Sequence, residues 1–273
     1  MTTPMKQRDA DGPNIARVYD FLLGGSHNFA PDRAAAGEFL ARWPDAPETM
    51  RLNRAFLGRA VRYLAGQVGI RQFLDIGSGI PTMGNVHAIA QQQAPDARVV
   101  YVDNDEVAVL HSRTILAGND RAVAIQADLR CPDEILGDPQ LCGMVDLAQP
   151  VALLLVAVLH FFPDADTPAA LVARLRDALA PGSYVVISHG TTDGQPSNVA
   201  DAMDLYNQTT AAFQPRTHAE VEAFFDGLVL IAPGLVHIPL WRPDEPEAAG
   251  DHPERIAAYG GVGYKPNRGS REP

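Results

Sequence analysis

Three aspartates each follow a short apolar run, at positions suited to binding a ligand. Asp75 ends "QFLD", Asp103 ends "VVYVD", and Asp128 follows "AVAIQA". Such runs are typical of buried strands, and parallel strands present their carboxyl ends at one edge of a sheet. We therefore expect the three carboxylates to lie together at that edge, where open α/β sheets bind ligands.

The turn after Asp75 reads "GSGIPT", with Gly77 and Gly79 but Thr82 where the dinucleotide fingerprint has its third glycine. The two glycines allow positive φ and close approach of the backbone to a ligand. Asp75 would repel a pyrophosphate but attract a cation such as the α-ammonium of S-adenosylmethionine, and Pro81 removes a backbone N–H that a phosphate could use. The alternative is a plain strand-to-helix turn with glycines for geometry.

The other two aspartates suit a nucleoside. Asp103 could accept both hydroxyls of a ribose, and Asn104 beside it could touch the purine. The alternative for Asp103 is a helix N-cap, but Asp105 fits that cap better. Asp128 could accept from the exocyclic amine of adenine while Leu129 lies on the ring face; taken alone, Asp128 also fits an ordinary loop carboxylate.

A histidine after the fourth apolar run is the candidate for chemistry. His160, in "VLHFFPD", would lie near the methyl group of such a cofactor and could act as a base toward an O–H or N–H nucleophile. The alternative is a histidine that caps the strand and bonds a backbone carbonyl. His189, at the end of "VVISH", is the second candidate.

The N-terminal segment "VYDFLLGGSHNFAPD" predicts a lid. Two glycines at 24–25, beside Tyr19, His27 and Asn28, suit a hinge that folds over the cofactor and excludes water. The alternative is a helix C-cap followed by a loop. Arg54, in "MRLNRAF", could pair with the carboxylate of the cofactor, or lie exposed at the surface.

Apolar runs alternate with amphipathic stretches, which is typical of a parallel sheet covered by helices on both faces. Strands are expected in residues 71–76, 97–102, 122–127, 150–158 and 182–189, with helices between them in 82–93, 105–118 and 166–182. Residues 228–231 and 235–243 predict an antiparallel hairpin that closes the sheet. We divide the chain into a helical cap or lid (1–69), a cofactor-binding domain (70–243), and a tail (244–273) expected to form a loop or to be partly ordered.

Composition argues against several classes of function. The chain has 273 residues and a net charge of -11, and without clustered Lys or Arg a nucleic-acid partner is not expected. Its longest apolar run, 151–162, has 12 residues, whereas a membrane span needs about 20. Cys131 and Cys142 lack C-x-x-C spacing, and residues 1–14 contain no apolar signal core. We expect a cytoplasmic protein without a membrane partner, and we find neither a metal-binding pattern nor the G-x-S-x-G of hydrolases.

Several motifs together resemble a known family. In order, "DIGSGIPT", "VYVDND", "ADLR", "PVALLLVAVLHF" and "LAPGSYVVISHG" are similar to the motifs of class I S-adenosylmethionine-dependent methyltransferases. More narrowly, "IARVYDFLLGGSHNFAPDR", "NRAFLGRAVRYLAGQVGIRQFLDIGSGIPT" and "WRP" resemble the actinobacterial S-adenosyl methyltransferase family that was formerly a domain of unknown function. The resemblance covers residues 14–243.

This resemblance implies a doubly wound, seven-stranded, mostly parallel sheet of the Rossmann-like methyltransferase type, with an antiparallel last strand. It implies S-adenosylmethionine as cofactor. By the same resemblance, Asp75, Gly77 and Gly79 would line the methionine part, Asp103 the ribose, and Asp128 with Leu129 the adenine.

Two functions from different classes remain open. One is an enzyme that methylates an oxygen or nitrogen of a small molecule. The other is an S-adenosylmethionine-binding protein without methyl transfer, acting as a sensor, as a partner-binding module, or through other chemistry on the bound sulfonium. A nicotinamide-dependent dehydrogenase is a third reading, against which Asp75 and the missing third glycine speak. The oligomeric state has no signature in the sequence.

Overall fold

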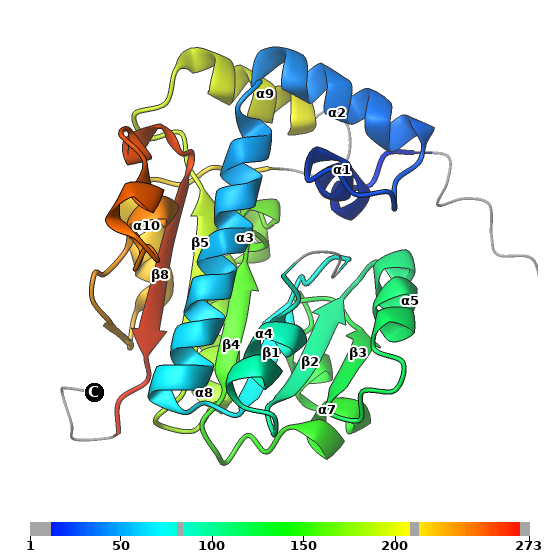
Figure 1. Cartoon of the computed structure of the whole chain (residues 1–273), viewed down its shortest axis with the longest axis vertical. Helices are drawn as coiled ribbons and strands as arrows, with labels where there is room; N and C mark the ends of the chain where they lie inside the picture. Colours follow the sequence, from blue (N-terminus) through cyan, green and yellow to red (C-terminus); the bar gives the residue numbers. More distant parts are fainter. Residues whose placement is uncertain (1–11, 81–83, 208–212, 268–273) are drawn as a thin grey trace, which may run out of the picture.

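A twisted, mostly parallel sheet forms the centre of the molecule. The structure is a computed structural model that describes residues 12–80, 84–207 and 213–267. Within these residues the sheet has eight strands in the order β3-β2-β1-β4-β5-β8-β6, with β7 paired to β8 (Figure 1). The strands are β1 (Gln72–Ile76), β2 (Arg98–Asp103), β3 (Ala122–Gln126), β4 (Ala152–Val156), β5 (Tyr184–Gly190), β6 (Val229–Leu230), β7 (Val236–His237) and β8 (Ala258–Tyr264). Neighbours among β1 to β5 are parallel, and β8 is antiparallel to its partners.

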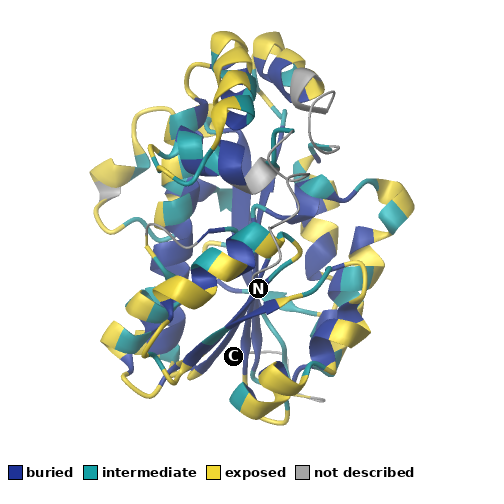
Figure 2. Ribbon diagram, turned by 90° about the vertical axis from the view of Figure 1, so that its right-hand side faces the viewer, coloured by how far each residue is buried: buried dark blue, intermediate teal, exposed yellow. Residues whose placement is uncertain are grey.

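Helices cover both faces of this sheet because alternate strand residues point to opposite sides. Phe73 belongs to the apolar core under α3, α4 and α5, whereas Leu74 belongs to the core under α6, α7, α8 and α10. Figure 2 shows the buried sheet between helices that expose their outer sides. The predicted doubly wound α/β class is confirmed. The helices are α3 (Ala46–Arg62), α4 (Val86–Gln93), α5 (Glu106–Ile115), α6 (Pro132–Leu136), α7 (Pro139–Met144), α8 (Pro168–Ala178) and α10 (His218–Glu222).

A cap of helices lies beyond the carboxyl ends of the strands (Figure 1). It consists of α1 (Ile15–Leu22), α2 (Ala30–Arg42) and α9 (Ser197–Asn207), which share a third apolar core. Val18 and Leu22, four residues apart, point into that core together with Phe39 and Met203. The cap therefore combines the N-terminal segment with a helix that follows β5. By contrast α3, in the segment predicted as cap, packs on the sheet through Phe56.

The tail predicted as a loop supplies a strand, so that prediction is wrong for Ala258–Tyr264. This strand, β8, lies between β5 and β6 inside the sheet. Its three glycines, which suggest a loop, are needed because side chains approach it from both sides. A Cβ on Gly260 would lie 2.9 Å from the Phe56 ring, and one on Gly263 would lie 2.8 Å from Phe225.

The predicted hairpin is also wrong. Both β6 and β7 pair with β8 rather than with each other, so β8 separates them from β5. The sheet consequently has eight strands rather than the seven that the family resemblance implies, two of them only two residues long. No helix among the described residues combines the length and the apolarity needed to cross a membrane.

Candidate functional site

A cavity of about 360 Å³ lies between the cap and the carboxyl ends of β1 to β4. Strand order reverses between β1 and β4, and open α/β sheets bind ligands at such a switch point. The volume falls in the range of roughly 300–1,000 Å³ that is common for small-molecule sites. Of the predicted cofactor residues, all but one line this cavity: Tyr19, Arg54, Asp75, Gly77, Gly79, Asp103, Asn104, Asp128 and Leu129.

The glycine turn forms the floor of the cavity. The backbone N–H groups of Gly77 and Ser78 donate to the carbonyl of Val102 on β2 at 2.8 and 3.2 Å, which bends the chain sharply after β1. Gly77 and Gly79 have φ of 71° and 60°, in the region that favours glycine. A Cβ on Gly77 would lie 2.3 Å from the side chain of Val158, so the turn packs directly against the segment after β4.

Asp103 is held by backbone donors on both of its oxygens. Its Oδ2 accepts from the N–H of Gly79 at 2.7 Å, and its Oδ1 accepts from the N–H of Asp105 at 2.9 Å. Asp105 caps α5 by accepting from the Val107 N–H at 2.8 Å, as predicted, so Asp103 is not the cap. Each carboxylate oxygen has a further lone pair, and the side chain is therefore oriented in the cavity wall with acceptor capacity remaining.

Asp75 is the unpaired acid of the site. It is 5% exposed and lines the cavity. Among the described residues nothing donates a hydrogen bond to its carboxylate; the groups that act on it are Arg54 and Asp103, through their charges. Burial raises the pKa of Asp75 to about 7, with Arg54 lowering and Asp103 raising it. A buried carboxylate without a partner is a strong acceptor for a cation.

The adenine side of the predicted site contains Asn104, Asp128 and Leu129. Asp128 accepts from the backbone N–H of Arg130 at 2.9 Å and from its guanidinium at 3.4 Å. Arg130 also donates to Asp166 at 2.9 Å, which ties the end of β3 to the segment after β4. Leu129 is 4% exposed and supplies an apolar wall beside these charges.

The cap contributes Tyr19 from α1, and the sheet-packed helix α3 contributes Arg54. Asn53 donates to the Tyr19 hydroxyl at 3.3 Å and accepts from the Ser188 hydroxyl of β5 at 2.6 Å, so Tyr19 is linked to the sheet. Arg54 donates to the carbonyl of Gly84 at 3.4 Å. Asn28 is the predicted cofactor residue that does not line the cavity; its amide donates to Asp20 at 3.1 Å and to the carbonyl of Gly25 at 2.9 Å.

His160, predicted to act as a base beside the reacting group, is not among the described residues that line the cavity. Its Nδ1 accepts from the backbone N–H of Gly190 at 3.3 Å, and its ring packs 4.3 Å from Phe161 and 4.4 Å from Phe213. Burial lowers the pKa of His160 well below its usual range, and His189 lowers it further. The residue therefore joins β5 to the segment after β4, close to the capping alternative.

His189, the second candidate, is also a structural group. Arg216 donates to its Nε2 at 3.0 Å, and the carbonyl of Gly190 lies 2.8 Å from its Nδ1. Because arginine keeps its charge, Nε2 must be the acceptor and Nδ1 must carry the proton. His189 is thus held as the neutral ring, and burial lowers its pKa to about 4.

Several cavity residues have no motif of their own. Leu23 and Asp20 of the N-terminal segment and Phe161 and Phe162 after β4 line the cavity. Only the helical spacing of four positions after Tyr19 could have revealed Leu23, which directly follows the end of α1.

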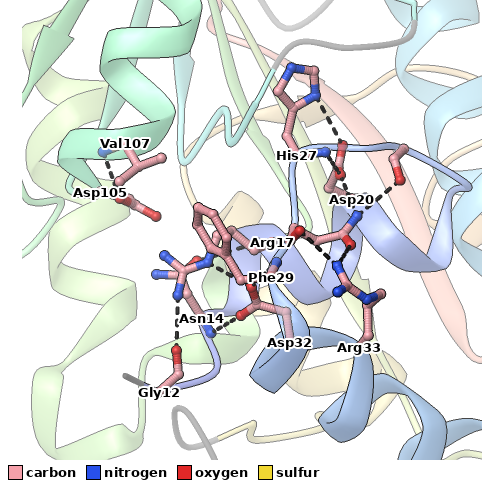
Figure 3. Close-up of polar contacts among 12 residues, drawn as sticks. Gly12, Asn14, Arg17, Asp20, His27, Phe29, Asp32, Arg33, Asp105 and Val107 are labelled. Atoms are coloured by element: carbon pink, nitrogen blue, oxygen red, sulfur yellow. Dashed lines mark hydrogen bonds and ion pairs between the residues drawn. The ribbon is translucent and has the colours of Figure 1, made fainter. Parts of the chain in front are cut away.

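The segment before α1 is positioned by a buried ion pair (Figure 3). The Arg17 guanidinium donates to Asp32 at 2.9 Å and to the carbonyl of Gly12 at 2.9 Å. Asp32 in turn accepts from the backbone N–H groups of Asn14 and Phe29, each at 2.8 Å. This network brings Asn14 to the cavity and to an adjoining open recess of about 470 Å³ that also contains Asn104 and Asp105.

Comparisons with known proteins show the family of the chain. The profile of the family described as S-adenosyl methyltransferase matches residues 1–266. A DUF574 family protein from Streptomyces avermitilis MA-4680 is 42% identical, with a TM-score of 0.91 over 94% of this chain and 99% of that one. A protein from Thermobifida fusca YX is 39% identical, with a TM-score of 0.90 over 97% and 100% of the two chains.

More distant structures share the fold. The N-methyltransferase NodS from Bradyrhizobium japonicum WM9, in complex with S-adenosyl-L-homocysteine, is 12% identical, with a TM-score of 0.51 over 92% of this chain and 100% of NodS. A search of curated proteins returns no match. The chain belongs to the S-adenosyl methyltransferase family, and its cofactor is S-adenosylmethionine, as the acidic strand ends and the ordered motifs predict.

Proposed function

We propose that this protein transfers the methyl group of S-adenosylmethionine to an oxygen or nitrogen of a small molecule. The observation that carries the proposal is the buried, unpaired carboxylate of Asp75 in the wall of a cavity that lies at the switch point of the sheet. The cofactor supplies an activated methyl group on a sulfonium. The remaining work, which is binding, orientation and exclusion of water, is done by the residues of the chain.

The residues present fit this cofactor. Asp75 offers its carboxylate to the α-ammonium, and Asp103 offers its remaining lone pairs to the ribose hydroxyls. Asn104, Asp128 and Leu129 form the adenine end. Arg54, on α3, is the candidate for the carboxylate of the methionine part. The assignment rests on charge and on the shared cavity.

The cap supports transfer to a small molecule. Its helix α1 lies over the carboxyl edge of the sheet next to α3, and the cavity is lined there by Tyr19, Leu23 and Phe161. Apolar and aromatic groups at that position exclude water from the reacting methyl group. We assign His160 a positioning role: it packs against Phe161 rather than touching the cavity.

The test is a binding titration followed by a search for turnover. Calorimetry should show binding of S-adenosyl-L-homocysteine and no binding of NAD at the same concentration. Incubation with S-adenosylmethionine and a panel of phenols, carboxylic acids and amines should then yield a methylated product by mass spectrometry. Binding without any product would favour the second candidate function, a cofactor-binding module. Binding of NAD alone would refute both.

A further inference from the structure

Two buried polar atoms beside the cavity have no hydrogen-bond partner among the described residues. They are Oδ1 of Asp20, on α1, and Nδ1 of His27, in the loop that joins α1 to α2. They lie 4.0 Å apart, too far for a hydrogen bond but close enough for one after a small movement of the ring. Asp20 is 3% exposed, and a Cβ on Gly25 would lie 2.1 Å from Oδ1, so the loop backbone closes over the carboxylate.

The other oxygen of the Asp20 carboxylate, Oδ2, binds the loop between α1 and α2. It accepts from the backbone N–H of His27 at 2.8 Å and from the Asn28 amide at 3.1 Å (Figure 3). On its other side, the His27 ring contacts His111 of α5 edge to face, with 4.6 Å between ring centroids. Since α5 follows β2, whose last residue is Asp103, His27 connects the cap to the sheet beside the cofactor cavity.

The charged and titratable groups around His27 come from three helices. Asp20 faces the ring from α1 and His111 faces it from α5. Arg33 of α2 is linked to His27 through the next residue, Asn28, because it donates to the carbonyl and side-chain oxygens of Asn28 at 3.0 and 3.1 Å. Asp20 is therefore the anion nearest to the His27 ring. A proton on Nδ1 would be directed at an oxygen that lacks a donor.

We propose that His27 is a positioning residue whose protonation latches the loop between α1 and α2 onto Asp20 and so holds α1 over the cofactor. With a neutral ring, opening the loop allows water to solvate both unpartnered atoms, which favours the open form. With a protonated ring, a charge-assisted bond to Asp20 favours the closed form. This inference rests on the proposed function, because α1 lines the cavity through Tyr19 and Asp20.

The test is the dissociation rate of S-adenosyl-L-homocysteine from the full chain, measured by surface plasmon resonance at about pH 6 and about pH 8, where histidine changes charge. His27→Gln removes the imidazole but keeps a polar side chain. We expect dissociation from this variant to equal that from wild type at the higher pH. At the lower pH, dissociation from the variant should be faster than from wild type by about fivefold or more, which is the lower end of the coupling effects commonly found between two sites.

Two further variants make the result specific. His252→Gln is the matched control, because His252 is a surface histidine whose side chain is 57% exposed. The ratio of its dissociation rate to that of wild type should be the same at both pH values. In an Asp20→Asn background, His27→Gln should have no further pH-dependent effect. The latch would be overturned if the ratio of the His27→Gln dissociation rate to that of wild type did not depend on pH. It would also be overturned if the pH-dependent effect of His27→Gln persisted in the Asp20→Asn background.

Hydrogen exchange tests the latch without the cofactor. The backbone N–H of His27 bonds to Asp20, so a latched loop protects this amide. After correction for the intrinsic pH dependence of exchange, protection should be greater at about pH 6 than at about pH 8 in wild type and unchanged in His27→Gln. Equal protection at both pH values would overturn the inference. Absence of S-adenosyl-L-homocysteine binding would instead count against the proposed function.

Discussion

Replacing Asp75 with asparagine should stabilise the protein without cofactor and weaken cofactor binding. Asp75 is buried, and its pKa is raised from 3.8 to about 7, chiefly by desolvation. At 1.36 kcal/mol per pKa unit this difference corresponds to about 4 kcal/mol. The sign follows from proton uptake: the folded protein keeps the proton that the unfolded chain releases above about pH 4. The stability contributed by the neutral carboxyl is complete below 3.8 and is lost as the pH rises through about 7.

The assay is urea unfolding of wild type and Asp75→Asn at pH values from about 4 to about 8, with circular dichroism and tryptophan fluorescence required to coincide. The advantage of the variant in free energy of unfolding should be small at the acid end. It should grow by about 2 to 4 kcal/mol at the alkaline end. Asp251→Asn, at an exposed position, is the control and should show no such growth. An advantage that stays constant with pH within about 1 kcal/mol would refute the buried-acid argument.

The substitution that stabilises the protein without cofactor, Asp75→Asn, should weaken cofactor binding. Because a cationic ligand prefers the ionised carboxylate, wild type should bind S-adenosyl-L-homocysteine more weakly as the pH falls through about 7. Asp75→Asn should bind more weakly than wild type at about pH 8 and lack this pH-dependent term. Calorimetry in two buffers of different ionisation enthalpy should detect a proton released on binding to wild type and none with the variant.

Three more predictions concern other positions. Asp103→Ala should weaken binding of S-adenosyl-L-homocysteine by about 1 to 3 kcal/mol, since the ribose hydroxyls lose their acceptor; a calorimetric loss well below this range would remove Asp103 from the ribose role. Gly260→Ala should lower the free energy of unfolding by about 1 to 3 kcal/mol through overpacking against Phe56, whereas Gly143→Ala, where a Cβ meets nothing within 4 Å, should be neutral or stabilising. His160→Ala should reduce the free energy of unfolding by about 2 kcal/mol and leave the affinity for S-adenosyl-L-homocysteine within about twofold; loss of turnover at unchanged stability would instead restore the base role.

The cofactor side of the site could be predicted from the sequence because it depends on local geometry. Asp75 near the end of the first strand, a turn that needs Gly77 and Gly79, and acids at or just after the next two strand ends all meet at one sheet edge, because parallel strands present their carboxyl ends together. The cavity contains every one of these residues.

The roles of the cap residues and of His160 were harder to predict from the sequence, because they depend on how separate segments of the chain pack together. The partners of the Asn28 amide, Asp20 and Gly25, are only eight and three residues away, but the sequence does not show that the loop folds so that they, rather than a ligand, accept its hydrogen bonds. Likewise, His160 follows the fourth strand as predicted, but only the folded chain shows that its ring bonds to the Gly190 N–H and packs against Phe213.

The sequence by itself determined the family, the cofactor and the acidic strand ends, because these follow from short-range patterns of glycine, acid and apolar residues. Tertiary structure decided the rest. The glycine-rich segment Ala258–Tyr264 is typical of a loop when the sequence is considered alone. In the folded protein it forms an inner strand, where its glycines leave room for Phe56 on one face and Phe225 on the other. In the same way, burial rather than neighbouring letters raises the pKa of Asp75, since only the folded chain removes water from that carboxylate.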